Sequence, residues 1–342
     1  MTPADLSLTV LRAVRRAVDD GALRVDVPSR VKIERARPGG AGEYASSIAL
    51  ALARPAGRSA LDVAGILEER LRGVPGLRAV EITGPGFLNF TLRSDTDADL
   101  VREILAAGTS YGHGTALAGT VVRLAGATEA RAALVAETLV RLLRSQGAGV
   151  EVGSGDGERV HVHPGAPGGH GTDAVRWAFL RAAPHDRPLD PGPLLVPHER
   201  NPLFRVQYAH SRTRRLLVNA RQLGFTPEPG RLDGLDQPRE PGRPGGSGRP
   251  GHPRHHAAPL LGALRDHPLV LLAAARHRAP DRVARHLEAV ADALLAFQHA
   301  VLPLGDEKPS AAHRSRLALA EAAGTVLAGG LSVLGISAPD RI

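Results

Sequence analysis

The segment from Leu203 to Ala220 constrains the fold most, because its buried-type side chains recur at steps of three, one or four residues. The stripe consists of Leu203, Val206, Ala209, His210, Thr213, Leu217 and Ala220. This spacing predicts an amphipathic helix. One face of that helix is therefore expected to be buried and the opposite face to be exposed.

The same segment is strongly basic. Residues 199–221 contain six arginines and one acidic residue, a balance of +5, whereas the whole chain carries only +8. Arg205, Tyr208, Arg212 and Arg215 are spaced 3-4-3, which places them on a stripe roughly opposite the buried one at about 100° per residue. Guanidinium groups match phosphate oxygens, and a phenol ring offers a stacking surface for a base. The pattern indicates a polyanionic partner, with a solvated basic face as the alternative.

The string Asn201-Pro202-Leu203-Phe204-Arg205-Val206-Gln207-Tyr208-Ala209-His210-Ser211-Arg212 resembles the start of the anticodon-binding helical domain of arginyl-tRNA synthetases. In that family the string reads Asn-Pro-x-aromatic-x-Val-Gln-Tyr-Ala-His-x-Arg. The closing residues 316–339 resemble the end of the same synthetases. The resemblance implies a DALR-type helical domain over residues 171–342. It also implies that Arg205, Gln207, Tyr208, Arg212 and Arg215 contact tRNA.

Residues 1–113 are predicted to form a small α+β domain. Helices are expected around 8–18, 44–53, 59–71 and 97–106, and strands at 31–35, 77–82 and 87–92. The strings Gly42-Glu43-Tyr44-Ala45 and Gly84-Pro85-Gly86-Phe87-Leu88-Asn89-Phe90 resemble the N-terminal additional domain of the same synthetases. In the family this domain packs against the tRNA elbow, so the resemblance implies tRNA contact by Phe87 and Asn89. The structural alternative puts Phe87 in the core and Asn89 at a strand edge.

Residues 119–170 are predicted to form a βαβ unit, with strands at 121–124 and 150–152 and a helix at 127–146. In the synthetases the nucleotide-binding catalytic domain starts at this point. There, a His-x-Gly-His signature at a helix N-terminus cradles the ATP phosphates. Here the first strand is followed by Gly126-Ala127-Thr128-Glu129-Ala130-Arg131, which contains no histidine. The first ATP-binding signature is therefore absent.

The second ATP-binding signature is absent as well. Residues 171–177, Gly-Thr-Asp-Ala-Val-Arg-Trp, resemble a helix that in the family closely follows Lys-Met-Ser-Lys, whose lysines stabilise charge on the ATP phosphates. The lysines of this chain are Lys32 and Lys308, and its one methionine is Met1. Roughly fifty residues replace a catalytic domain several times larger. The unit at 119–170 is thus interpreted as a vestigial remnant, and neither catalytic residues nor a cofactor are expected.

Metal and phosphate sites are not expected elsewhere. The histidines fall into two clusters, His161, His163 and His170 in one and His252, His255 and His256 in the other. Imidazoles at such spacings could bind zinc, but both clusters lie in Gly/Pro-rich segments and the chain has no cysteine. Gly153–Gly157 is interpreted as a turn, because no helix with Lys-Ser/Thr follows it.

The C-terminal domain is interrupted by a segment of unusual composition. Residues 228–257 are rich in Pro, Gly, Arg and His and lack apolar periodicity, which predicts a disordered linker. Beyond it, helices are expected at 260–265, 268–275, 281–301 and 310–334. The sequence shows no signal-peptide pattern, no membrane-spanning run and no cysteine, so a cytoplasmic protein without a membrane partner is expected.

The sequence thus predicts a multi-domain α+β and all-α chain: an α+β N-terminal domain, a βαβ spacer and a helical bundle. Its resemblance implies a truncated, non-catalytic paralogue of arginyl-tRNA synthetase that binds tRNA, with arginine tRNA as one candidate. After the long helix the synthetases usually carry an aromatic-Tyr-Asn run that helps to read the anticodon, whereas this chain has Phe297-Gln298-His299. The alternatives are a protein that docks on a full-length synthetase or a biosynthetic complex, and a residual arginine-tRNA ligase.

Overall fold

The chain divides into two compact units, Met1–Thr96 and Asp97–Ile342. The structure, a computed structural model, describes residues 3–36, 41–92, 96–153, 157–166, 172–230, 232 and 257–342. The predicted linker falls almost wholly outside these residues, as do the histidines at 170, 252, 255 and 256. The fold combines an α+β N-terminal region with a helical C-terminal domain, as the sequence predicts.

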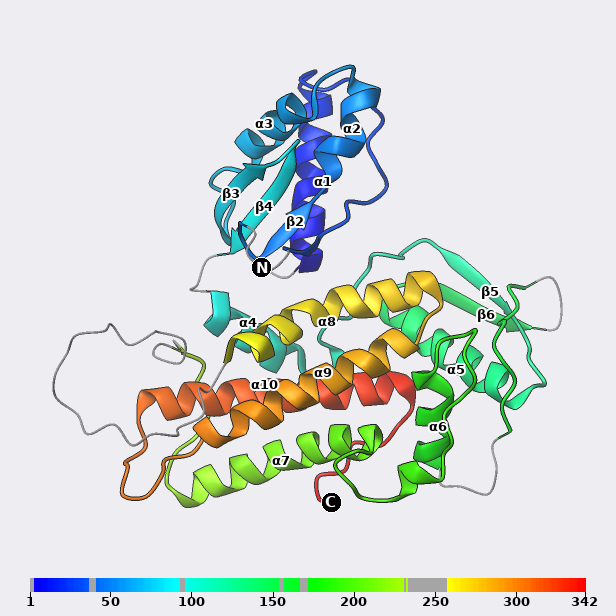
Figure 1. The fold of residues 1–342 in the computed structure, drawn as a ribbon, viewed down its shortest axis with the longest axis vertical. Coiled ribbons are helices and arrows are strands. Elements are labelled where there is room, and N and C mark those ends of the chain that lie inside the picture. The colour runs from blue at the N-terminus through cyan, green and yellow to red at the C-terminus, as the bar shows by residue number, and fades with distance from the viewer. Residues whose placement is uncertain are drawn as a thin grey trace. The chain divides into compact units, whose positions relative to one another are not determined.

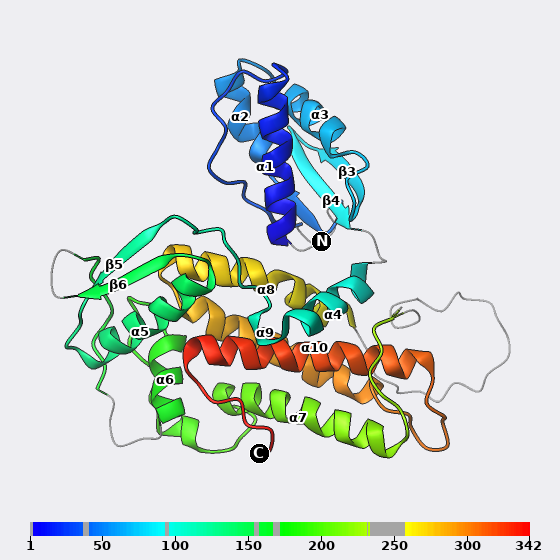
Figure 2. The same cartoon turned by 180° about the vertical axis from the view of Figure 1, so that it is seen from behind.

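Unit 1 is an antiparallel sheet with strand order β1-β2-β4-β3, packed against helices. Its elements are α1 (Pro3–Asp19), β1 (Glu34–Arg35), β2 (Tyr44–Ser46), α2 (Ile48–Ala56), α3 (Ala60–Leu71), β3 (Leu77–Thr83) and β4 (Phe87–Leu92). Helix α1 crosses the sheet in Figure 2, and its apolar side chains share one core with Leu88 and Phe90 of β4. Helix α3 begins as expected, with the Ser59 hydroxyl accepting a hydrogen bond from the Asp62 amide.

One predicted helix of unit 1 begins too early. Residues 44–46, expected to be helical, form strand β2, which pairs with β4 so that Tyr44 lies opposite Phe90. The helix starts only at Ile48. Tyr44 and Ser46 are buried, and a cross-strand partner stabilises them more than the first turn of a short helix would.

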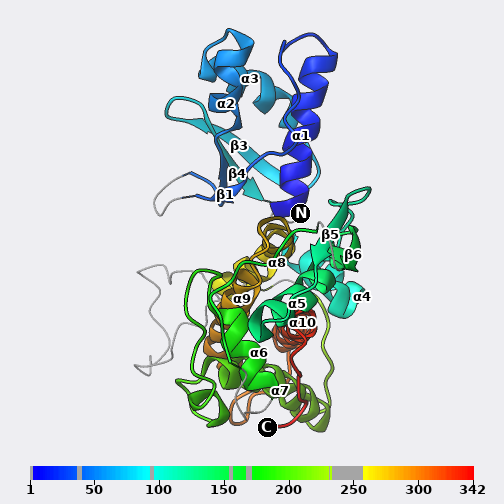
Figure 3. The ribbon, with the colours of Figure 1, turned by 90° about the vertical axis from the view of Figure 1, so that its right-hand side faces the viewer.

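Unit 2 is a helical bundle with a small parallel sheet at one end (Figures 1 and 3). Its helices are α4 (Thr96–Ala107), α5 (Ala130–Ser145), α6 (Thr172–Arg181), α7 (Pro202–Gln222), α8 (Ala257–His277), α9 (Asp281–Phe297) and α10 (Ala311–Leu334). Helix α4 contributes Leu100, Val101 and Ile104 to the core of this unit. The units therefore separate at Thr96, whereas the sequence pattern places the boundary after residue 113.

The small sheet is the predicted βαβ unit. Strands β5 (Val121–Ala125) and β6 (Gly149–Gly153) pair in parallel, and α5 forms the crossover between them. Leu139, Leu142 and Leu143 of α5 are buried in the same core as the bundle helices. The βαβ unit is thus an integral part of unit 2.

Helix α8 differs from the prediction of two separate helices, because it runs through Pro268 without a break. Proline has no N–H to donate to the carbonyl four residues earlier, here that of Leu264. The Tyr111 hydroxyl, from a distant part of the chain, donates to this carbonyl at 3.3 Å. A hydrogen bond that the helix itself cannot make is therefore supplied by a side chain, and the helix continues.

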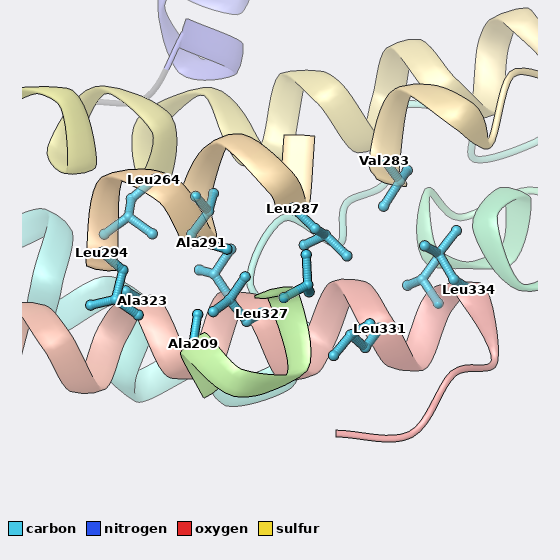
Figure 4. Packing of buried hydrophobic residues seen from close by; sticks show 14 of the residues in the cluster. Ala209, Leu264, Val283, Leu287, Ala291, Leu294, Ala323, Leu327, Leu331 and Leu334 are labelled. Atoms are coloured by element: carbon cyan, nitrogen blue, oxygen red, sulfur yellow. The ribbon is translucent and has the colours of Figure 1, made fainter. Parts of the chain in front are cut away.

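Helix α10 occupies the centre of the bundle. An 18-residue window of it is long and apolar enough to cross a membrane, but 78% of that window is buried inside the protein. A Cβ on Gly324 would lie 2.2 Å from the Thr213 hydroxyl, and one on Gly330 would lie 2.5 Å from Leu287. These two glycines thus allow α7 and α9 to pack closely against α10. Figure 4 illustrates this packing around Leu287 of α9 and Leu327 of α10.

Candidate nucleic-acid interface

Helix α7 is fixed at its start by Asn201. The Asn201 side-chain oxygen accepts from the Phe204 amide at 3.1 Å, and its Nδ2 group donates to the carbonyls of Leu194 and Val196 at 2.8 and 2.9 Å. Pro202 occupies the first helical position, where a missing N–H costs nothing. One buried side chain thus caps the helix and ties it to the preceding loop.

The predicted buried stripe of α7 is confirmed. All seven of its members are buried, together with Ser211 and Leu216. The stripe packs against α9 and α10. The His210 ring lies 3.0 Å from the Pro339 carbonyl, and burial lowers the pKa of this histidine.

The outward side of α7 carries an aromatic pair followed by an arginine. The rings of Phe204 and Tyr208 stack with centroids 5.7 Å apart, and Tyr208 is 39% exposed. Arg215, two turns further along, is exposed and has no hydrogen-bond or ion-pair partner within the part of the chain that the structure describes. We call Phe204, Tyr208 and Arg215 the outer face of α7.

The two other predicted arginines, Arg205 and Arg212, lie at the edge of the outer face of α7, where they contact neighbouring elements. Arg205 forms an ion pair with Asp292 of α9. Arg212 donates from Nε to the side-chain oxygen of Gln298 at 2.6 Å. On the helix surface, both arginines lie beside the buried stripe. Their side chains therefore reach Asp292 of α9 and Gln298 just after it.

Gln207 is engaged inside the protein. Its amide nitrogen donates to the Asp173 carboxylate and to the Ser337 carbonyl, both at 3.1 Å. Asp173 in turn accepts from the Ser337 amide. Gln207 therefore joins α6, α7 and the segment after α10.

In unit 1, the two predicted residues lie on strand β4. Phe87 is 39% exposed, whereas Asn89 is only 6% exposed. The Asn89 amide donates to the Thr83 hydroxyl at 2.6 Å and approaches the Glu81 carbonyl at 3.4 Å. Phe87 thus offers an accessible ring, and Asn89 holds β4 to β3.

The N-terminus of α5 corresponds to the place where the synthetases carry their first ATP-binding signature, which is absent from this chain, and an acidic side chain occupies it here. The Glu129 carboxylate accepts from the amides of Arg131, Ala132 and Gly165 at 3.1, 2.7 and 2.9 Å. Burial raises the pKa of Glu129, but these backbone hydrogen bonds outweigh burial and leave its pKa below the ordinary value. A carboxylate thus occupies the amide donors that an anion would use.

Arg131, next to this carboxylate, is a residue whose role the sequence did not reveal. Its side chain is 1% exposed and donates to the carbonyls of His163, Phe179, Ala182, Ala183 and Asp186, at 2.7 to 3.1 Å. Several of these carbonyls lie at or just after the end of α6, where a helix leaves acceptors unsatisfied. A buried guanidinium therefore replaces water as the donor.

Only part of the two predicted histidine clusters lies within the described residues. Within the described residues, no group of three or more His, Asp or Glu side chains is arranged to hold a metal ion. His161 and His163 are exposed, and the other four histidines of the two clusters lie outside those residues.

Comparisons with known proteins identify two family domains in this chain. Residues 8–92 match the family described as arginyl tRNA synthetase N terminal domain, and residues 206–342 match the DALR anticodon binding domain. The arginine–tRNA ligase of Frankia alni is 43% identical over 157 residues, which is 43% of this chain and 28% of that protein. That of Micrococcus luteus is 41% identical over 165 residues, or 44% of this chain and 30% of that protein.

A solved structure of the Thermus thermophilus arginyl-tRNA synthetase resembles this fold. Its TM-score is 0.54 at 15% identity, and the match covers 100% of both chains. At that identity the likeness concerns the fold alone. The alignments with the curated relatives span less than a third of their length.

Proposed function

The chain belongs to the arginyl-tRNA synthetase family, of which it carries the N-terminal domain and the DALR anticodon-binding domain, and from this premise we propose that it binds tRNA without aminoacylating it. The outer face of α7 carries the proposal. Arg215 projects from a helix whose opposite side is buried, and Tyr208 is held by stacking on Phe204. The planar guanidinium fork matches phosphate oxygens, and a ring already held by stacking loses little conformational entropy on binding a base.

Arg212 and Arg205 contribute at the edge of this face. A guanidinium has five N–H donors. Arg212 donates from Nε to the side-chain oxygen of Gln298, so its two terminal amino groups remain available to bind phosphate. Arg205, already paired with Asp292, adds less net charge. Gln207 supports the face by holding α7 in place.

On unit 1, Phe87 is the accessible ring through which the N-terminal domain would contact tRNA. Asn89 would act indirectly, because its amide is used to hold β4 against β3. Both assignments rest on the family resemblance of the Gly84–Phe90 string together with the exposure of Phe87.

The proposed contacts are to phosphates and stacked bases, not to a particular anticodon. Gln298, in the short turn after α9, is held by Arg212 and donates to the Leu295 carbonyl at 3.0 Å. Its amide is thus engaged within the protein, which leaves His299 as the exposed neighbour. Arginine tRNA is a candidate through the family, and a cytoplasmic location would match this partner.

The absence of aminoacylation rests on the chemistry of the remnant. Glu129 places a negative charge where a nucleotide phosphate would need amide donors. Residues 33–307 also contain no lysine to stabilise charge on a phosphate during transfer.

Binding is tested by titrating purified tRNA against the full chain, with fluorescence anisotropy at several salt concentrations. Phosphate contacts require affinity to fall as salt rises. Arg215→Ala should weaken binding by about 3- to 10-fold and reduce the salt slope by about one. Arg282→Ala, which removes an exposed arginine of α9, is the matched control. Absent or salt-independent binding by the unmodified chain would overturn the proposal.

Two further measurements separate the alternatives. Arginine-dependent exchange of pyrophosphate into ATP should be at background, and measurable exchange would refute the non-catalytic part. Replacing Arg205, Arg212 and Arg215 together by alanine should abolish RNA binding. A protein that only docks on a synthetase would keep its function in this variant.

A further inference from the structure

Among the described residues, the two-stranded sheet of unit 2 has one open edge. On the outer side of β5, Ala125 donates to the Glu158 carbonyl and Glu158 donates to the Arg123 carbonyl, at 3.0 and 2.8 Å. On the outer side of β6, by contrast, no strand of the described residues is paired. β6 is largely exposed, and its Val152 side chain is 56% exposed.

The direction of the backbone along this edge follows from the bonds to β5. The Gly149 amide donates to the Thr120 carbonyl, and the Gly153 carbonyl accepts from the Gly126 amide, both at 2.9 Å. Alternate residues of a strand point their polar groups to opposite sides. The N–H and C=O groups of Val150 and Val152 therefore point outwards, available to another strand.

The sequence of β6, Gly149-Val150-Glu151-Val152-Gly153, reads the same in both directions. In an antiparallel pair of two such strands centred on Glu151, Val150 of one lies opposite Val152 of the other. These are the residues with outward backbone groups, so each facing pair would exchange both of its hydrogen bonds. A register one residue away would place each outward-pointing residue opposite an inward-pointing one and lose these paired bonds.

We propose that this edge is a self-association surface, on which two copies of the chain join β6 to β6 in antiparallel orientation and form a continuous four-stranded sheet. The contact is isologous, since the same strand is used by both copies. It goes beyond tRNA binding and does not depend on it.

The side chains fit this arrangement on the face of the sheet that packs on α5. Val150 is partly buried against the core of unit 2. Val152 lies on the same face but further from the core, and it is exposed. Pairing places Val150 of the second copy beside Val152, so an exposed apolar side chain gains an apolar neighbour across the strands.

Charges on the opposite face permit the same register. Two Glu151 side chains would face each other, which alone would oppose pairing. Each is already bound by Arg123 of β5, with Nε 2.9 Å from Oε2, so the row of four side chains carries no net charge.

The outward carbonyl of Val150 already has one neighbour, the Arg144 guanidinium, at 3.5 Å. Because a carbonyl can accept a second hydrogen bond, this contact leaves room for the strand of a second copy.

The chain contains no cysteine, which makes a single introduced thiol a clean probe of the register. Non-hydrogen-bonded antiparallel pairs bring Cα atoms to about 4.5 Å, within disulfide reach. Glu151→Cys should therefore form a covalent dimer under mild oxidation. Val152→Cys is the matched control: its own copies would lie about 8 Å apart, beyond that reach.

A disulfide dimer that forms at least tenfold faster in Glu151→Cys than in Val152→Cys is the expected result. Equal rates in the two variants would indicate random collision and overturn the proposal. The absence of a dimer in both variants would also overturn it, and this result would be expected if the edge bound a different protein. Adding Val152→Pro to Glu151→Cys removes an outward N–H but no bond to β5. Circular dichroism should be unchanged and cross-linking lost; persistent cross-linking would overturn the proposed pairing.

Discussion

The guanidinium of Arg278 forms a two-pronged ion pair with the carboxylate of Glu158, with Nε–Oε1 and Nη2–Oε2 distances of 3.0 Å each. Arg278 lies in the turn between α8 and α9, and Glu158 lies after β6, within residues 119–170. The ion pair therefore links the βαβ unit to the helical bundle. Arg278 also adopts a left-handed backbone conformation, with φ of 53°.

The ion pair and the left-handed backbone of Arg278 together predict that its glycine variant is more stable than its alanine variant. Replacement by alanine removes the ion pair and keeps the strained backbone, so a loss of about 1–2 kcal/mol is expected. Replacement by glycine removes the same pair but relieves about 1 kcal/mol of strain. Urea unfolding should rank the unmodified chain first, Arg278→Gly second and Arg278→Ala third. An alanine variant as stable as the glycine variant would contradict this account.

Removal of the Arg131 guanidinium should be among the most damaging changes in unit 2. Arg131→Met keeps much of the volume but leaves five carbonyls without their donor. Each unsatisfied buried acceptor is costly, and a total loss above about 3 kcal/mol is expected. Arg123→Met, at a side chain that is 75% exposed, should lose less than about 1 kcal/mol. Similar losses in both variants would show that the five hydrogen bonds matter little.

The helices and strands that the sequence predicts well are those with a periodic pattern of their own. The stripe of α7, the cap at Ser59 and the strands around Gly84-Pro85-Gly86 depend on neighbours a few residues away. Local spacing and turn chemistry therefore suffice to locate them.

The features that escaped prediction depend on partners far along the chain. Strand β2 needs Phe90 opposite Tyr44, and α8 passes Pro268 because Tyr111 supplies the missing donor. Arg205 and Arg212 belong to the exposed pattern by spacing, but Asp292 and Gln298 engage their side chains. No local pattern contains these pairings, since they arise only when the helices pack.

A stacked pair of histidines, the buried His267 and the half-buried His286, predicts how stability depends on pH. The rings of His267 and His286 stack 5.2 Å apart inside unit 2, and burial lowers the pKa of His286 to about 4. Burial also lowers the pKa of His267, with further lowering by His286 and His113. In the unfolded chain these side chains titrate near their ordinary value of about 6.5. The unfolded state therefore takes up protons first, and stability falls between pH 6.5 and 4.

The loss attributable to His286 is about 3 kcal/mol across that window, from a shift of roughly 2.5 pH units. His286→Phe keeps an aromatic ring and removes the titrating group, so the stability of this variant should fall less steeply with acid in urea titrations. His299→Gln, at an exposed position, should retain the profile of the unmodified chain. A phenylalanine variant with an unchanged slope would show that this histidine pair does not govern the acid response.

Glu129 predicts a competition between a carboxylate and an external anion at the N-terminus of α5. Glu129→Ala frees the amides of Arg131, Ala132 and Gly165, and the lost cap should cost about 1–2 kcal/mol. The freed amides then form an anion site, so inorganic phosphate should raise the melting temperature of the variant by mass action. Sodium chloride at equal ionic strength is the control for both proteins. If phosphate stabilises the unmodified chain equally, the carboxylate does not occupy the anion position, and the structural argument against nucleotide binding fails with it.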